Sequence, residues 1–182
     1  MEIRFGEWRI RSFARGDARS LAAYANNADV AKYLRDTFPH PYKESDAKAW
    51  IRLASNELPE TNFAIASRQE PIGGIGLLFG RDVFRRNAEL GYWLGEPYWG
   101  RGIATQAVAA FVDYAFEVFD IGKLTAGVFD GNVASQRVLE KNGFVLEGRF
   151  RQHLIKNGEL KDYLVFSLLK ADRAPSGPRH SS

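Results

Sequence analysis

The fold is decided by residues 89–107, which read Glu-Leu-Gly-Tyr-Trp-Leu-Gly-Glu-Pro-Tyr-Trp-Gly-Arg-Gly-Ile-Ala-Thr-Gln-Ala. Residues 87–95 predict a strand, and the apolar run from Ile103 to about Phe119 predicts a helix buried between layers. Gly100-Arg101-Gly102 joins the two. Such a turn places free N–H groups and the positive end of a helix dipole beside a strand end, which favours phosphate binding. The alternative is a glycine-rich turn that only packs the helix on the strand.

Outward from this stretch, helices are expected early in the chain and antiparallel strands in its middle. Strands are predicted at 7–13, 62–67, 72–79, 123–129, 144–155 and 159–169. Helices are predicted at 18–26, 29–34, 45–54 and 132–141. Ser45 is the expected cap of the third early helix, with Ala49, Trp50 and Leu53 as its apolar stripe. Together these elements predict an α+β fold with a mixed, mostly antiparallel central sheet, flanking helices and one β-α-β crossover.

The last two strands enclose Asn157-Gly158, the strongest short hairpin signal. A two-residue turn at this point sets a register that places His153 opposite Asp162. These two side chains are either a base with its orienting carboxylate or, as is far commoner, an exposed cross-strand pair.

Composition excludes several classes of protein. The 182 residues are 45% apolar, which suits one domain, expected at 1–170, with a polar, disordered tail at 171–182. Lys and Arg number 25 against 22 Asp and Glu, without a basic block, so no nucleic-acid partner is expected. Zero cysteines exclude disulfides and a thiol nucleophile, and three histidines make a metal site improbable. Neither a membrane span nor a signal peptide is apparent, so we expect a cytoplasmic protein with no membrane partner.

Other phosphate and catalytic motifs fit less well. The P-loop pattern matches nowhere. Gly100 and Gly102 match two of the three glycines of the dinucleotide-binding fingerprint. Asp130, just after the next predicted strand, stands where that motif has an acidic residue for the ribose. A doubly wound domain needs several crossovers, however, so a nucleotide-binding oxidoreductase is the weaker interpretation. A Ser-His-Asp hydrolase would need a Gly-x-Ser-x-Gly elbow, which the sequence lacks.

Residues 89–107 resemble motif A of the GNAT superfamily of N-acetyltransferases. Asp130-Gly-Asn132-x-x-Ser135-x-x-Val-Leu-Glu-Lys-x-Gly-Phe144-x-x-Glu-Gly148 resembles its motif B. Both are most similar to the RimJ/RimL branch, which acetylates protein N-termini, with the spermidine acetyltransferases close by. The similarity runs from about residue 8 to 170.

The resemblance implies acetyl-CoA as co-substrate and makes the crossover its site. The family's loop, which wraps the pyrophosphate with backbone amides, corresponds here to Trp99, Gly100, Arg101, Gly102, Ile103 and Ala104, followed by Thr105. Trp99 departs from the family's Gln or Arg, which removes one polar side-chain contact. Trp93, Leu94 and Gly95 would lend main-chain groups to the pantetheine arm. The helix cap Asn132 matches an asparagine that contacts the same arm in the family. The strands at 87–95 and 123–129 are expected to splay apart.

Amide formation from a thioester needs a base for the amine and a proton for the leaving thiolate. Glu89 is the best candidate base, its alternative being an ion pair with Arg85 or Arg86. Ser135, third in the motif B helix, matches a serine that serves as acid in RimL-like enzymes; a plain helix-start hydroxyl is as good an interpretation. No tyrosine lies in that helix, so Ser135 or water must serve. Without cysteine, direct transfer in a ternary complex is expected.

The acceptor is less defined. A protein or peptide N-terminus and a small-molecule amine both fit, and the early helices carry no acidic run that would favour a polyamine. By analogy with the family, Tyr33, Phe38, Tyr42 and Trp50 shape the acceptor pocket; individually they fit core or lid packing equally well. A non-catalytic acyl-CoA-binding or regulatory module on the same fold is the alternative from another class. A monomer and a homodimer are both compatible with the sequence.

Overall fold

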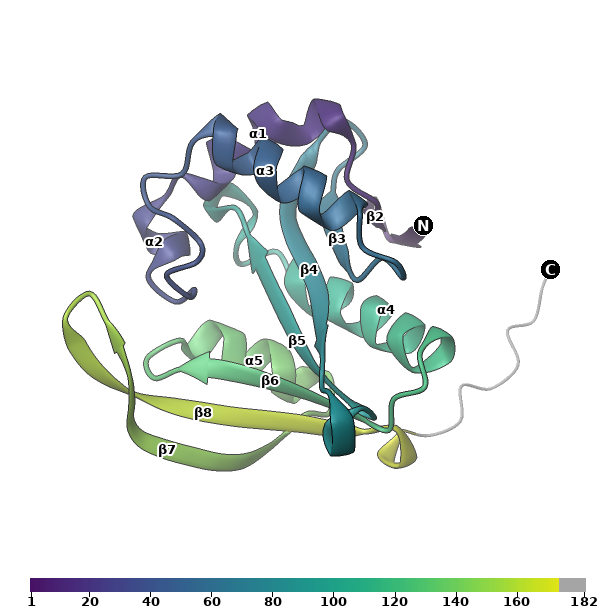
Figure 1. Cartoon of the computed structure of the whole chain (residues 1–182), viewed down its shortest axis with the longest axis vertical. Helices are drawn as coiled ribbons and strands as arrows, with labels where there is room; N and C mark the ends of the chain where they lie inside the picture. Colours follow the sequence, from purple (N-terminus) through teal and green to yellow (C-terminus); the bar gives the residue numbers. More distant parts are fainter. Residues whose placement is uncertain (174–182) are drawn as a thin grey trace.

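The computed structural model describes residues 1–173 and shows one eight-stranded sheet with helices against both faces (Figure 1). The strands are β1 (Glu2–Phe5), β2 (Trp8–Arg11), β3 (Asn62–Ala66), β4 (Pro71–Phe79), β5 (Asn87–Leu94), β6 (Lys123–Phe129), β7 (Val145–Lys156) and β8 (Glu159–Leu169). The helices are α1 (Ala18–Ala25), α2 (Ala28–Ala31), α3 (Glu44–Ser55), α4 (Ile103–Val118) and α5 (Val133–Lys141). Short 3-10 turns are η1 (Arg15–Asp17), η2 (Asp82–Phe84), η3 (Glu96–Tyr98) and η4 (Lys170–Asp172). The tail expected to be disordered, 171–182, lies outside the described residues from 174 onward.

The sheet order is β1-β2-β3-β4-β5-β6-β8-β7, and every neighbouring pair is antiparallel except β5 and β6. That parallel pair spans only three residue pairs, from Asn87 opposite Lys123 to Glu89 opposite Thr125. Beyond it the two strands diverge, as Figure 1 shows. The predicted α+β fold, the single crossover and the splay of these strands are confirmed, and this topology is not a doubly wound domain.

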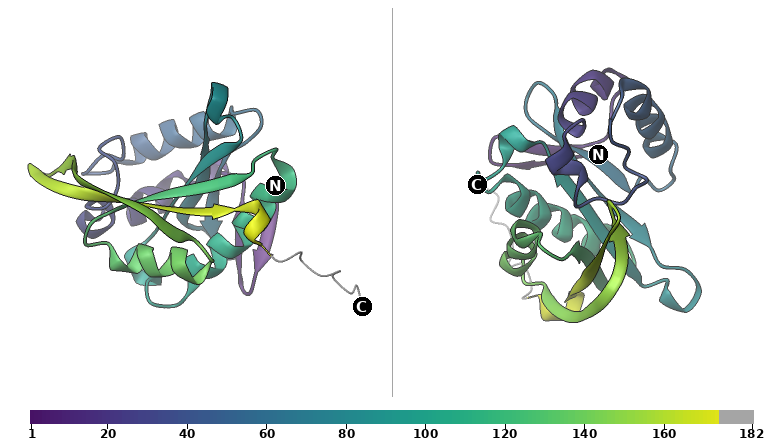
Figure 2. Two further views of the ribbon diagram at one scale, coloured as in Figure 1. Left: turned by 90° about the horizontal axis from the view of Figure 1, so that it is seen from below. Right: turned by 90° about the vertical axis from the view of Figure 1, so that its left-hand side faces the viewer.

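Helices lie on both faces of the sheet (Figure 2), and a separate apolar cluster lies on each face. Alternation along β3 separates them: Phe63 and Ile65 belong to the cluster that contains the buried side of α4, whereas Ala64 packs with α1 and α3. α4 buries the side chains Ile103, Ala107, Val108, Phe111, Val112, Ala115 and Phe116. The first residue of α4 is therefore anchored in the core, which fixes the start of the helix.

The strand expected at 7–13 is present as β2, which spans only Trp8–Arg11. Its neighbour β1 was not predicted; the chain turns at Gly6 and Glu7 so that Phe5 lies opposite Trp8. The cap predicted for the third early helix, Ser45, is wrong. In α3 the cap is Lys43, whose N–H donates to the Asp46 carboxylate at 2.8 Å.

The stripe of α3 that packs on the sheet also differs from the predicted one. Trp50 and Leu53 are exposed, and α3 instead buries Ala47, Ile51 and Ala54. The two alanines of this face let the helix lie close to the sheet, and Ile51 is its one large buried side chain.

The C-terminal hairpin turns at Asn157-Gly158 as predicted, with Lys156 opposite Glu159. The pairing of His153 with Asp162 is wrong, because the register shifts between Leu154 and Phe150. The Asp162 carboxylate instead accepts from the Gln152 N–H at 2.8 Å and from Arg149 Nε at 2.6 Å. The His153 ring stacks on Tyr163 with centroids 5.7 Å apart. The histidine is therefore not arranged as a base with an orienting carboxylate.

Candidate active site

The site is built around the point where β5 and β6 separate. Glu89 is the last residue of β5 that pairs with β6, so its side chain marks the start of the splay. Successive side chains of β5 point to opposite faces of the sheet. Glu89 and Trp93 therefore share the face covered by α1 and α3, and Tyr92 packs with the cluster on the α4 side.

The free edge of β5 is defined by its ladder with β4. The Gly95 N–H donates to Ile72 O at 2.8 Å, and bonded pairs alternate with non-bonded pairs along an antiparallel ladder. The main-chain groups of Trp93 and Gly95 therefore face β4. Those of Tyr92 and Leu94 face the diverging side, where an extended ligand would add along the strand.

The turn into α4 has the conformation that phosphate binding requires. Gly100 and Gly102 have φ of 70° and 73°, in the left-handed region that favours glycine. Gln106 N–H makes the first bond of α4, to Gly102 O at 3.1 Å, so the three preceding N–H groups have no acceptor within the helix. Trp99 Nε1 donates to Leu94 O at 2.7 Å and so ties the turn to the end of β5. This explains how a tryptophan can stand where the family has Gln or Arg.

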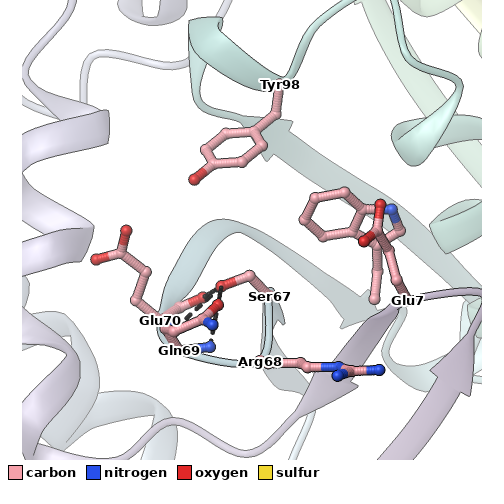
Figure 3. A pocket seen from close by; sticks show the side chains of 7 residues that line it. Glu7, Ser67, Arg68, Gln69, Glu70 and Tyr98 are labelled. Carbon is pink, nitrogen blue, oxygen red and sulfur yellow. Dashed lines mark hydrogen bonds between the residues drawn. The ribbon is translucent and has the colours of Figure 1, made fainter.

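The Arg101 side chain is directed toward the β1–β2 hairpin. Its guanidinium lies 5.0 Å from the Trp8 ring and 5.9 Å from the Tyr98 ring, and Nη2 lies 3.8 Å from the Glu7 carboxylate. Beside this contact is a hollow of about 550 Å³ (Figure 3), lined by Glu7, Trp8, Ser67, Arg68, Gln69, Glu70 and Tyr98. The hollow lies beside the β1–β2 hairpin and not at the point where β5 and β6 separate, so it is distinct from the candidate reaction centre.

Ser135 and Asn132 lie where β6 passes into α5. Asn132 is the helix cap, as predicted, and its side chain accepts from the Ser135 N–H at 3.2 Å. The Ser135 hydroxyl lies 2.8 Å from the Tyr92 hydroxyl, so a residue of β5 reaches across the splay to the helix that follows β6. Burial raises the pKa of Tyr92 to about 12. Tyr92 was not singled out from the sequence, where it reads as one more aromatic residue of a half-buried strand.

Glu89 is paired with Arg35, from the loop after α2, and not with Arg85 or Arg86. Arg35 Nη2 lies 2.6 Å from Glu89 Oε1, and this carboxylate raises the pKa of Arg35. Tyr163 of β8 adjoins the pair. Burial is the main cause of its raised pKa, and the negative charge of Glu89 adds to the increase. Arg35 and Tyr163 could not be found from sequence, because neither carries a local signal that links it to Glu89.

Gly127 of β6 allows Tyr163 to reach this position. A side-chain carbon at Gly127 would lie 1.6 Å from the Tyr163 hydroxyl, so the tyrosine lies directly over the glycine. Phe38 packs edge-on against Trp93 with centroids 5.4 Å apart and contacts Tyr42. Phe38, Tyr42 and Trp93 thus form an aromatic group on the same face of the sheet as Glu89.

The remaining early aromatics occupy different positions. Tyr42 is buried among α1 and α3, and the exposed Trp50 lies on α3. The Tyr33 hydroxyl donates to Gly131 O at 3.1 Å, which links the loop after α2 to the start of α5.

Comparison with known proteins agrees with this geometry. Residues 8–145 match the family model described as Acetyltransferase (GNAT) domain. The chain is 32% identical to the uncharacterized N-acetyltransferase p20 of Bacillus licheniformis, over 91% of this chain and 94% of the relative. It is 28% identical to the spermidine N(1)-acetyltransferase of Escherichia coli strain K12, over 85% and 81% of the two chains. The solved structure of RimL, the ribosomal L7/L12 alpha-N-protein acetyltransferase in complex with coenzyme A, superposes with a TM-score of 0.82 at 20% identity, covering 93% and 98%.

The chain belongs to the GNAT acetyltransferase family and is an N-acetyltransferase that uses acetyl-CoA. The resemblance to the RimJ/RimL type is confirmed, and the oxidoreductase interpretation is wrong. These residues fit acetyl-CoA. The turn at Gly100–Gly102 offers main-chain donors for a phosphate, and the open edge of β5 offers them for an extended chain. Within residues 1–173, no helix is long and apolar enough to cross a membrane.

Proposed function

We propose that this protein transfers the acetyl group of acetyl-CoA to a primary amine by direct attack in a ternary complex. The observation that carries the proposal is the position of Glu89, at the last β5–β6 pair and on the α1–α3 face, while Ser135 lies by Tyr92 on the α4 side. A carboxylate and a hydroxyl thus flank the splay from opposite faces. The chain has no cysteine to carry an acetyl group.

The turn and the strand edge would hold the co-substrate. The free N–H groups of Ile103 and Ala104 and the adjoining glycine turn would bind its pyrophosphate. Main-chain groups of Tyr92 and the N–H of Leu94, whose carbonyl accepts from Trp99, would line the pantetheine arm together with Asn132. When bound, acetyl-CoA supplies an activated acetyl thioester. Trp99 and Arg101 hold the turn in shape through their contacts with Leu94 O and the Trp8 ring.

Glu89 would accept the proton that the amine loses, directly or through a water, and the Ser135 hydroxyl would supply a proton to sulfur. The net change is one proton from nitrogen to sulfur as the C–S bond breaks and the C–N bond forms. Arg35 engages Oε1 of Glu89 and so fixes the direction of the carboxylate. General acid–base contributions of this kind are worth about 10²–10⁴-fold in rate.

The acceptor we favour is the N-terminal amine of a protein or peptide. The face that carries Glu89 is flanked by the aromatic rings of Phe38 and Trp93, which would pack on the first side chains of a peptide. Arg35 already neutralises Glu89, so this carboxylate offers less attraction to a polycation. Spermidine is the second candidate, since a relative that is 28% identical is a spermidine N(1)-acetyltransferase.

The decisive experiment is a thiol-release screen with acetyl-CoA against peptides and small amines, followed by Glu89→Gln on the best acceptor. We expect turnover to fall about a hundredfold while calorimetry shows unchanged acetyl-CoA affinity. Glu147→Gln is the matched control, because Glu147 is likewise a half-exposed carboxylate paired with a cation, Lys123. Full turnover of Glu89→Gln across the pH range would remove Glu89 from the mechanism. CoA binding without thiol release for any amine would favour a non-catalytic module.

A further inference from the structure

The Tyr92 hydroxyl is a partly buried titratable group with no role in the mechanism so far. Its ring packs against the core on the α4 side, and its hydroxyl has two possible acceptors on one residue: Ser135 Oγ at 2.8 Å and Ser135 O at 3.3 Å. Hydrogen bonds between two oxygens have lengths of about 2.5–3.0 Å. Either hydroxyl can donate in the 2.8 Å contact, and we assign the donated proton to Tyr92 because Ser135 Oγ is the nearer of its two acceptors.

This assignment fixes where the serine proton can go. A hydroxyl has one proton to donate and two lone pairs. If Ser135 Oγ accepts from Tyr92, its own proton cannot point back at the tyrosine and must point to a third group. The raised pKa of Tyr92, about 12, keeps the phenol protonated across the working range of pH, so the donor is always present.

The second contact of Ser135 adds to this constraint. The backbone N–H of Ser135 donates to Asn132 Oδ1, which fixes the first turn of α5. Tyr92 comes from β5 and Ser135 from the helix after β6, so their contact crosses the splay beyond the last pair, Glu89 with Thr125. The serine proton is therefore held beside the space that the splay opens.

We propose that Tyr92 is a positioning residue, which turns the Ser135 hydroxyl proton toward the sulfur of acetyl-CoA and strengthens Ser135 as a donor. This rests on the proposed role of Ser135. As the C–S bond breaks with its electron pair on sulfur, the serine proton moves to sulfur and the Tyr92 hydrogen bond stabilises the charge left on Oγ. Tyr92 keeps its own proton, and water restores that of Ser135.

The test uses the thiol of bound CoA, because this readout does not need the acceptor. Ultraviolet absorbance of the thiolate, followed against pH, gives the pKa of the bound thiol in the wild type, Tyr92→Phe, Ser135→Ala and the double variant. A directed hydroxyl stabilises the thiolate, so the wild type should have the lowest value. Each single variant should raise the pKa of the bound thiol. The expected change is a decrease of about fivefold to tenfold in its acid dissociation constant, a typical loss for one hydrogen bond.

Non-additivity separates positioning from packing. If Tyr92 acts through Ser135, Tyr92→Phe has no further effect once Ser135 is alanine, for the thiol pKa and for kcat alike. KM for acetyl-CoA should stay unchanged. Tyr114→Phe is the matched control, since Tyr114 is a partly buried tyrosine that packs against Phe63 and Phe119, on the far part of α4. It should leave the thiol pKa and turnover as they are.

Three results would overturn the inference. One is that Tyr92→Phe changes the thiol pKa equally in the wild type and in Ser135→Ala. Another is that it changes the thiol pKa in neither. The third is a thiol pKa that does not respond to Ser135→Ala, which would remove the role of Ser135 while acetyl transfer by the wild type stands. Failure of the proposed function has a different signature, namely no thiol release by the wild type with any amine.

Discussion

Arg35 Nη2 lies 2.6 Å from Glu89 Oε1, and the two residues are 54 positions apart in the chain. The Arg35 and Glu89 side chains are 58% and 33% exposed, so the pair should add less than about 1 kcal/mol to stability. Arg35→Ala should therefore leave the melting temperature nearly unchanged. Because the carboxylate loses the group that fixes its direction, kcat/KM for the amine should fall roughly tenfold.

Steady-state kinetics with varied amine and varied acetyl-CoA check this prediction. The loss should appear only with the amine, and Arg35→Lys should recover part of it, since a lysine keeps the charge but lacks the planar fork. An equal loss for both substrates would show that Arg35 serves the whole site and not Glu89.

Trp99→Phe tests the link between the turn and β5. The substitution keeps an aromatic ring but removes the indole N–H that donates to Leu94 O. One hydrogen bond is worth about 1 kcal/mol, so the affinity for CoA should fall about fivefold as the turn loosens. Calorimetric titration measures this, with Trp50→Phe on the exposed side of α3 as the control. An unchanged affinity would mean that the glycine turn holds its shape without Trp99.

Gly127→Ala should displace Tyr163, because the added carbon would meet the tyrosine hydroxyl and ring. Overpacking of this kind costs about 1–3 kcal/mol, which urea denaturation can measure. Activity should also fall, since Tyr163 adjoins Arg35 and Glu89. Gly122→Ala is the control, because nothing lies within 4 Å of a carbon added there. If Gly127→Ala were as stable and active as the wild type, the contact of Tyr163 with Gly127 would have no consequence.

Asp162 should make part of the stability dependent on pH. The Gln152 N–H first, and then Arg149, lower the pKa of this carboxyl in the folded protein. Its contribution is therefore complete above the unfolded value, about 3.9, and is lost as the pH falls through the lower folded value. Asp162→Asn should be less stable than the wild type at neutral pH, and the difference should shrink in acid. Melting curves of both proteins, recorded from neutral to acidic pH, check this prediction. A difference in stability that stayed constant over this range would contradict it.

Local signals explain what could be predicted from sequence. The glycine turn, the cap Asn132 and the Asn157-Gly158 hairpin are each set by residues within a few positions of one another, and the structure has all three. The strand expected at 7–13 is present as the shorter β2, but β1 was missed because its four residues show no clear pattern before the turn at Gly6 and Glu7. The pairing of His153 failed because a register shift inside a long hairpin has no signature in the turn.

The candidate site was predictable only where it is contiguous. Glu89 and Ser135 stand in motifs, but their partners Arg35 and Tyr92 are defined by three-dimensional contact. A hydrogen bond between distant residues depends on how the strands and helices pack, and neither residue type nor spacing encodes it. The loop that carries Arg35 is held near Glu89 by contacts to distant parts of the chain, such as the Tyr33 hydrogen bond to Gly131 O.

The short parallel ladder has one more consequence, which concerns how acceptors could change during evolution. Glu89 lies on one face of the sheet and Ser135 toward the other, so in the proposed reaction the acceptor and the thioester approach from different faces. The size of the acceptor is then independent of the space that the thioester occupies. A folded protein offering its N-terminus and a small diamine could reach the same carboxylate. New acceptors could arise from changes in the loop after α2 and in Phe38, with the thiol half of the enzyme left untouched.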